Sequence, residues 1–137
     1  MSDAPKRPGS RERVREFLAQ HGLAEQIHEF EQSTKTAQAA ADAMGCELGQ
    51  IVKSLVVVVD GDRPALALVA GDRRADLVAI AAELEGAKAR MADADTVRSA
   101  TGYAIGGVSP SMVRMDRRRL FEMSGGRVAR ISLDQTV

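Results

Sequence analysis

The chain has 137 residues, the size of one domain, and 45% of them are hydrophobic, which is enough for one continuous core. Its 19 basic and 19 acidic residues give a formal net charge of zero, which excludes a strongly basic DNA-coating protein and a charge-rich disordered chain. The single cysteine, Cys46, excludes an intrachain disulfide and a zinc cluster built on cysteines. We therefore expect one soluble domain whose contacts with nucleic acid are local.

The N-terminal residues, the length of the apolar runs and the aromatic content further restrict the class of protein. Residues 1–9 hold two prolines and little to bury, so we expect a flexible leader there and one domain over residues 10–137. No apolar run approaches the ~20 residues that span a bilayer, which predicts a cytoplasmic protein without a membrane partner. With no Trp, one Tyr and three Phe, the chain lacks the aromatic platforms of proteins that coat single-stranded RNA.

The first third of the chain predicts a helix, a strand and a second helix. Ser10 can cap the first helix, and Gly22 ends it. Apolar and polar residues alternate over residues 24–30, which predicts a short strand. The alanine-rich stretch 37–44 follows candidate threonine caps and stops at Gly45, as expected of a helix.

The middle of the chain predicts a β-hairpin. Residues 51–59, IVKSLVVVV, are apolar on both faces, which is typical of a strand in the middle of a sheet. A turn at 60–62 leads to a second apolar run, 64–70, which Pro64 can only open. Helical spacing then predicts a helix over 77–84.

The remaining pattern completes an α/β domain with a mixed sheet. We expect a short strand at 88–91, a helix over 94–100 capped by Asp93, and a last strand at 128–133 after a turn at Gly125 and Gly126. Hairpin and helical crossovers in one chain favour this class.

Lys53 is the residue that most needs an explanation, because it lies inside the most apolar strand. Its side chain either reaches water from a strand end or faces an anionic or carbonyl-bearing substrate in a cleft. The stretch 102–110, GYAIGGVSP, is rich in glycine and ends in proline. Such a loop is either a tight connection or a cradle whose N–H groups point at an oxyanion or phosphate.

Other common chemistries have no support in the sequence. No Gly-x-Ser-x-Gly, Walker or His-Glu-x-x-His motif is present. We interpret His21 as a helix-end residue, His28 as structural, and Cys46 as a small buried hydrophobe. We also interpret Asp93 as a helix cap.

Four segments in order and spacing carry a resemblance: STKTA at 33–37, GCE at 45–47 leading into QIVKSL at 50–55, GDRR at 71–74, and TGYAIGGVSP at 101–110. Together they resemble the YbaK/EbsC family, including the editing domain of many bacterial prolyl-tRNA synthetases, over residues 10 to 110. The resemblance implies a single compact α/β domain with a curled, partly barrel-like mixed sheet flanked by helices. It also implies hydrolysis of mischarged tRNA, commonly alanine or cysteine on the tRNA for proline, without metal or other cofactor.

The resemblance assigns roles by position. Lys53 would act with the amides of Gly106 and Gly107, and the attacking group would be water. A second set of residues is expected to line the amino-acid pocket: Phe30, Thr34, Ser54, Val108, Ser109 and Pro110.

The tail after Pro110 is about ten residues shorter than the family pattern, and it is rich in arginine. Arg114, Arg117 and Arg118 are candidate contacts for tRNA phosphates, with a solvated charged surface as the alternative. The expected partners are mischarged tRNA and, as a second candidate, prolyl-tRNA synthetase. Two other functions stay open: a non-catalytic module that binds aminoacyl-tRNA, a nucleotide or a synthetase, and a structural dimerising domain.

Overall fold

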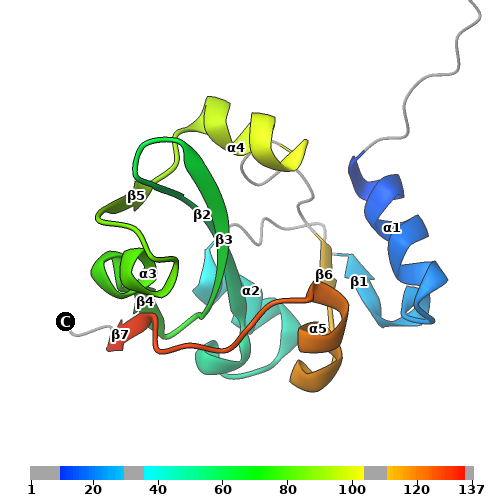
Figure 1. The fold of residues 1–137 in the computed structure, drawn as a ribbon. Helices are drawn as coiled ribbons and strands as arrows, with labels where there is room; N and C mark the ends of the chain where they lie inside the picture. Colours follow the sequence, from blue (N-terminus) through cyan, green and yellow to red (C-terminus); the bar gives the residue numbers. More distant parts are fainter. Residues whose placement is uncertain (1–9, 30–35, 104–110, 135–137) are drawn as a thin grey trace, which may run out of the picture.

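The computed structural model describes residues 10–29, 36–103 and 111–134, so the expected leader at 1–9 lies outside the described residues. The chain folds as an α/β domain with antiparallel sheets (Figure 1). In chain order its helices and strands are α1 (Ser10–Gln20), β1 (Ile27–Glu29), α2 (Ala37–Met44), β2 (Val52–Val59), β3 (Arg63–Ala70), β4 (Arg73–Ala75), α3 (Leu77–Glu83), β5 (Ala89–Met91), α4 (Ala94–Thr101), β6 (Ser111–Val113), α5 (Arg117–Ser124) and β7 (Ser132–Asp134). Short 3-10 helices at Ala24–Gln26 and Leu48–Gln50 precede β1 and β2.

The centre of the fold is a three-stranded sheet with the order β3-β2-β5. Val57 of β2 lies across from Ala65 of β3 on one side and from Met91 of β5 on the other. Two small sheets pair strands far apart in sequence: β1 with β6, and β4 with β7. All these pairs are antiparallel, so the described residues show none of the parallel pairing that a mixed sheet contains.

The main core lies between the hairpin and α3. Val57 and Val59 are fully buried, and they pack in one cluster with Ile80 and Ala81 of α3. Because side chains alternate along a strand, Lys53 and Leu55 belong to the same face of β2 as these valines. Lys53 is thus placed at the end of the core face.

Most predicted elements are confirmed, with small shifts of their ends. Helix α2 has the predicted bounds, with Thr36 accepting a bond from the Ala39 amide and Gly45 in the left-handed region. The hairpin, α1, α3, β5 and α4 also form where expected. Pro64 is the second residue of β3, where the strand tolerates it because β3 is an edge strand of the sheet.

The structure corrects the prediction in the C-terminal part. The predicted strand at 128–133 is wrong in extent, because only its end belongs to β7. Three elements were not predicted: β4, β6 and α5. The two strands have three residues each, too few for a clear alternation, and α5 has a run of arginines at its start that masks its apolar face.

Candidate functional site

Lys53 is half-buried at the start of the core face of β2. Its ammonium group donates a hydrogen bond to the backbone carbonyl of Arg73, the first residue of β4. A lysine is costly in such a position unless a polar group compensates its charge, and among the described residues a single carbonyl does so. The ammonium keeps further donors for a ligand, because it has three in all.

Arg73 joins this lysine to the last strand. Its Nε donates to the Ser132 hydroxyl at 2.7 Å, its Nη2 donates to the Ser132 carbonyl at 3.2 Å, and its Nη1 forms an ion pair with Asp134 at 2.6 Å. The residue whose carbonyl accepts the hydrogen bond from Lys53 is therefore fixed to β7. We call these four residues, Lys53, Arg73, Ser132 and Asp134, the lysine clamp.

A close backbone approach fixes the same end of the hairpin. The Gly71 amide donates to the Ile51 carbonyl at 2.7 Å, and a Cβ at Gly71 would lie 2.5 Å from the carbonyl oxygen of Leu48. Only glycine fits there without a shift of the backbone. The resemblance motif GDRR therefore starts with a residue needed to bring Arg73 beside β2.

Ser54 lies on the opposite face of β2 from Lys53, because the two are neighbours in a strand. It is exposed and lies across from Leu68 of β3. The structure therefore does not bring these two predicted site residues to one face of the strand. The other pocket residues, Phe30, Thr34 and residues 106–110, lie outside the described residues.

The residues before the glycine-rich loop are held by α1. Arg13 donates to the Gly102 carbonyl at 3.1 Å, and its guanidinium lies 4.3 Å from the centre of the Tyr103 ring. Cation–π contacts of this kind stabilise by roughly 0.5–1 kcal/mol at exposed sites. Helix α1 thus anchors the chain where the predicted oxyanion loop begins.

The tail arginines have different surroundings. Arg114 donates to the Met44 carbonyl at 3.2 Å, which ties the tail to α2. Arg117 and Arg118 are exposed in the first turn of α5, whose cap is the Asp116 carboxylate. Asp116 thus serves as a helix cap in this structure.

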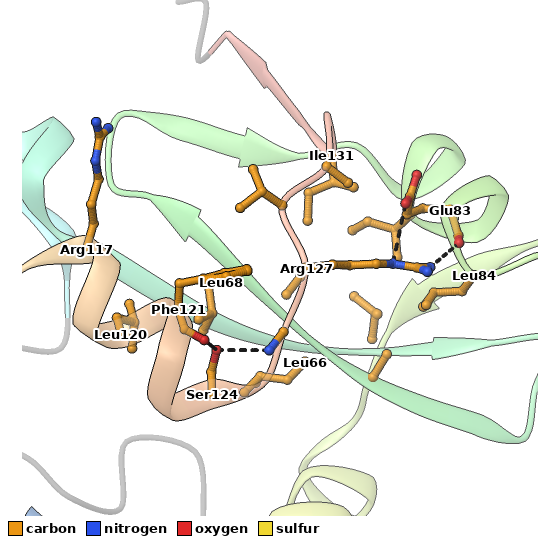
Figure 2. Close-up of a pocket in the computed structure, with 17 residues that line it drawn as sticks. Leu66, Leu68, Glu83, Leu84, Arg117, Leu120, Phe121, Ser124, Arg127 and Ile131 are labelled. Atoms are coloured by element: carbon orange, nitrogen blue, oxygen red, sulfur yellow. Dashed lines mark hydrogen bonds and ion pairs between the residues drawn. The ribbon is translucent and has the colours of Figure 1, made fainter. Parts of the chain in front are cut away.

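A cavity in the described part of the chain lies away from Lys53, along the edge of β3 that has no strand partner among the described residues. It has a volume of about 480 Å³. Figure 2 shows the residues that line it on β3, α3, α5 and the segment 126–131, with Arg117 at one end and the ion pair of Arg127 with Glu83 at the other. This cavity was not predicted from the sequence.

The remaining candidates have structural surroundings. Cys46 packs against the small cluster formed by α2 and Ile51, but it is only partly buried, whereas a buried side chain was expected. Asp93 caps α4, and its hydrogen bond from Thr96 lowers the pKa of the Asp93 carboxyl. His28 is exposed on β1, and His21 ends α1 with a 2.9 Å contact from its ring to the Phe17 carbonyl. No helix in the described residues is long and apolar enough to cross a bilayer.

Comparisons with known proteins agree with the resemblance seen in the sequence. Residues 31–120 match the family model of the aminoacyl-tRNA editing domain. The chain is 37% identical over 97 residues to the uncharacterized protein YwhH of Bacillus subtilis, covering 71% of this chain and 61% of YwhH. It is 30% identical over 113 residues to the multifunctional Ser/Thr-tRNA deacylase ProXp-y of Escherichia coli K12, covering 80% of this chain and 67% of that protein.

A solved structure supports the fold. A protein described as a candidate trans-editing enzyme for prolyl-tRNA synthetase superimposes with a TM-score of 0.80 at 30% identity, covering 93% of this chain and 99% of that one. The chain spans less than two thirds of YwhH, while it spans nearly all of the solved chain.

Proposed function

This chain belongs to the aminoacyl-tRNA editing domain family, and from that premise we propose that it is a trans-editing hydrolase that removes the amino acid from mischarged tRNA. The observation that carries the proposal is the half-buried Lys53 at the end of the core strand, bonded to one carbonyl only among the described residues. A cation held there at a cost in desolvation is explained by a substrate that develops negative charge.

The proposed reaction is hydrolysis of an ester. A water oxygen attacks the acyl carbon, and the carbonyl oxygen becomes the oxyanion of a tetrahedral intermediate. The bond from this carbon to the ribose oxygen then breaks, and the ribose oxygen takes up the proton that the attacking water has lost and becomes a hydroxyl as the free amino acid leaves. We expect the Lys53 ammonium to stabilise the oxyanion together with the amides of Gly106 and Gly107, with no metal or cofactor.

The proposed substrate carries a small amino acid, alanine, cysteine or a similar one, on the tRNA for proline. In this proposal Phe30, Thr34 and Ser54 form part of the amino-acid pocket, and Val108, Ser109 and Pro110 complete it. One methylene in an apolar pocket changes selectivity by only about 1–3 kcal/mol, so small amino acids need to be compared directly. The name of the relative ProXp-y adds serine and threonine to the comparison.

The proposed partner is the tRNA, and the proposed location is the cytoplasm. In this proposal Arg114, Arg117 and Arg118 contact phosphates of the tRNA. Two of these arginines are exposed on one helical turn, as phosphate contacts require. Prolyl-tRNA synthetase is the proposed protein partner, since it produces the mischarged substrate.

The test is hydrolysis of Ala-, Cys-, Ser- and Thr-charged tRNA for proline by the wild type and by Lys53→Ala. We expect turnover with at least one substrate and a loss of about 100-fold or more in the variant, the effect of removing one oxyanion donor. Lys88→Ala, which changes an exposed lysine beside β5, is the matched control and should keep full activity. If the wild type binds tRNA without turnover, the protein is a non-catalytic binding module instead.

A further inference from the structure

The apolar cavity along β3 has a cation at one end, Arg117, that no described residue neutralises. Arg127 is paired with Glu83 at 3.4 Å, and it also donates to the Glu83 carbonyl. The Ser124 hydroxyl donates to the Phe121 carbonyl and accepts from the Gly126 amide, both at 3.2 Å. Among the described residues, none forms a hydrogen bond or ion pair with the Arg117 guanidinium.

The cavity also has an aromatic wall beside this cation. Phe121 lies four residues after Arg117 in α5, so both side chains lie on one face of the helix and line the cavity. Phe121 is 48% exposed, and Leu66 on the facing strand β3 is 60% exposed. Exposed apolar side chains of this size around a hollow mark a binding site more often than a lone surface residue does.

We propose that this cavity binds one unstacked nucleotide of the tRNA acceptor end, with its base against Phe121 and its phosphate on Arg117 (Figure 2). The volume of about 480 Å³ is within the usual range of small-molecule sites, roughly 300–1,000 Å³. The exposed cation at its mouth can attract an anion, and the flat ring suits a base, which an aliphatic acid would not use. This inference rests on the proposed function only for the identity of the RNA.

The position of the cavity fits this role. Leu68 lines it and is the neighbour of Val69, which lies across from Lys53 in the hairpin. The cavity lining therefore reaches to within one residue along β3 of the pair that holds Lys53, with the Leu68 side chain on the opposite face of the hairpin from the lysine. Among the described residues, the polar side chains of the lining other than Arg117 are already paired, so we expect the base to be held mainly by shape and stacking, and its identity to matter little.

A direct test uses tryptophan, which the chain otherwise lacks. In Phe121→Trp we expect AMP and CMP to quench the emission with affinities within about threefold of each other, because stacking tolerates every base. Ribose 5-phosphate and octanoate should not quench it. The matched control is Phe17→Trp, since Phe17 is also 48% exposed but lies on α1, and it should not respond. Quenching by octanoate alone, or by no nucleotide at all, overturns the inference.

A second test uses deacylated tRNA and does not depend on the tryptophan variant. Phe121→Leu keeps an apolar side chain and should weaken binding about tenfold, whereas Phe17→Leu should not. Arg117→Gln should reduce the slope of log affinity against log salt by about 0.7, the value for one phosphate of a single strand, while Arg90→Gln on β5 should leave it unchanged. Unchanged affinity in Phe121→Leu overturns the inference.

The two proposals fail separately in this experiment. Lys53→Ala should lose turnover and keep its affinity for deacylated tRNA. If turnover depends on Lys53 while Phe121 and Arg117 have no effect on binding, only the nucleotide site is wrong. If both residues affect binding while no mischarged tRNA is hydrolysed, only the proposed function is wrong.

Discussion

At the turn end of the β2–β3 hairpin Val57 and Val59 are fully buried, whereas at the opposite end Val52 is 47% exposed and Lys53 is held by a backbone carbonyl. The two ends belong to the same two strands and the same continuous ladder of pairs. One end excludes water and supplies packing energy, while the other leaves a cation and exposed strand within reach of a ligand. Stability and chemistry are therefore separated along a single hairpin.

The turn end is closed by polar groups as well as by packing. The Asp60 carboxylate accepts from the amides of Lys88 at 3.0 Å and Ala87 at 2.9 Å, and it pairs with Arg63 at 3.4 Å. A Cβ at Gly86 would lie 2.3 Å from Val59, so the chain after α3 passes directly over that side chain. Each polar group there serves the connection between α3 and β5.

The largest expected effect is on stability at the closed end. Val59→Ala removes two buried carbons and should lower the free energy of unfolding by about 2 kcal/mol, the loss of transfer energy plus a cavity term. Val52→Ala is the matched control at the open end, and it should cost no more than about 0.5 kcal/mol because the side chain is largely in water. Urea unfolding followed by circular dichroism measures both. Equal losses of unfolding free energy in the two variants would show that the two ends of the hairpin contribute equally to stability.

A smaller effect is expected from the lysine clamp. Arg73→Gln removes the guanidinium that fixes β7, and kcat for mischarged tRNA should fall about fivefold, equivalent to ~1 kcal/mol for one net hydrogen bond. KM should change little, because Arg73 acts on Lys53 and not on the bound tRNA.

The control for the clamp is Asp134→Asn. It removes only the ion pair of a carboxylate that is 83% exposed, so kcat should stay within about twofold. A rise in KM without a fall in kcat in Arg73→Gln would contradict the positioning role and indicate a direct contact with tRNA.

The smallest effect is a pH dependence at the turn. Hydrogen bonds from the Lys88 amide and then the Ala87 amide lower the pKa of the Asp60 carboxyl below 3.8. Because the folded pKa is lowered, the carboxylate stabilises the fold above the unfolded pKa, and this contribution is lost as pH falls through the folded pKa. The difference in unfolding free energy between wild type and Asp60→Asn should therefore shrink from pH 6 to pH 3. A difference that grows over this range would reverse the sign of the argument.

The hairpin and the helices α1 to α4 were predictable because their signals are local. A β-branched run with a turn at residues 60–62 specifies β2 and β3, and cap residues such as Thr36 and Asp93 specify where helices begin. Strands β4 and β7 are different, since Arg73 pairs with Asp134 across the chain and each strand has only three residues. Nothing in a short segment shows which distant segment will pair with it.

The candidate site was predictable only in part, for the same reason. A lysine within an apolar strand marks Lys53, but its contact with the carbonyl of Arg73 needs the fold. The cavity beside Phe121 is formed by β3, α3, α5 and the segment after α5, so no single sequence motif predicts it. An aromatic residue one helical turn after an arginine was the one available signal.

The contacts of the lysine clamp also imply an order in which the protein folds during its synthesis. The hairpin joins neighbours in sequence and can form as soon as residue 70 is available, whereas Arg73 meets Ser132 across 59 positions. On a translating ribosome the domain therefore has its central strands long before Lys53 has its final surroundings. A nascent chain would be folded in its middle before the surroundings of Lys53 are complete.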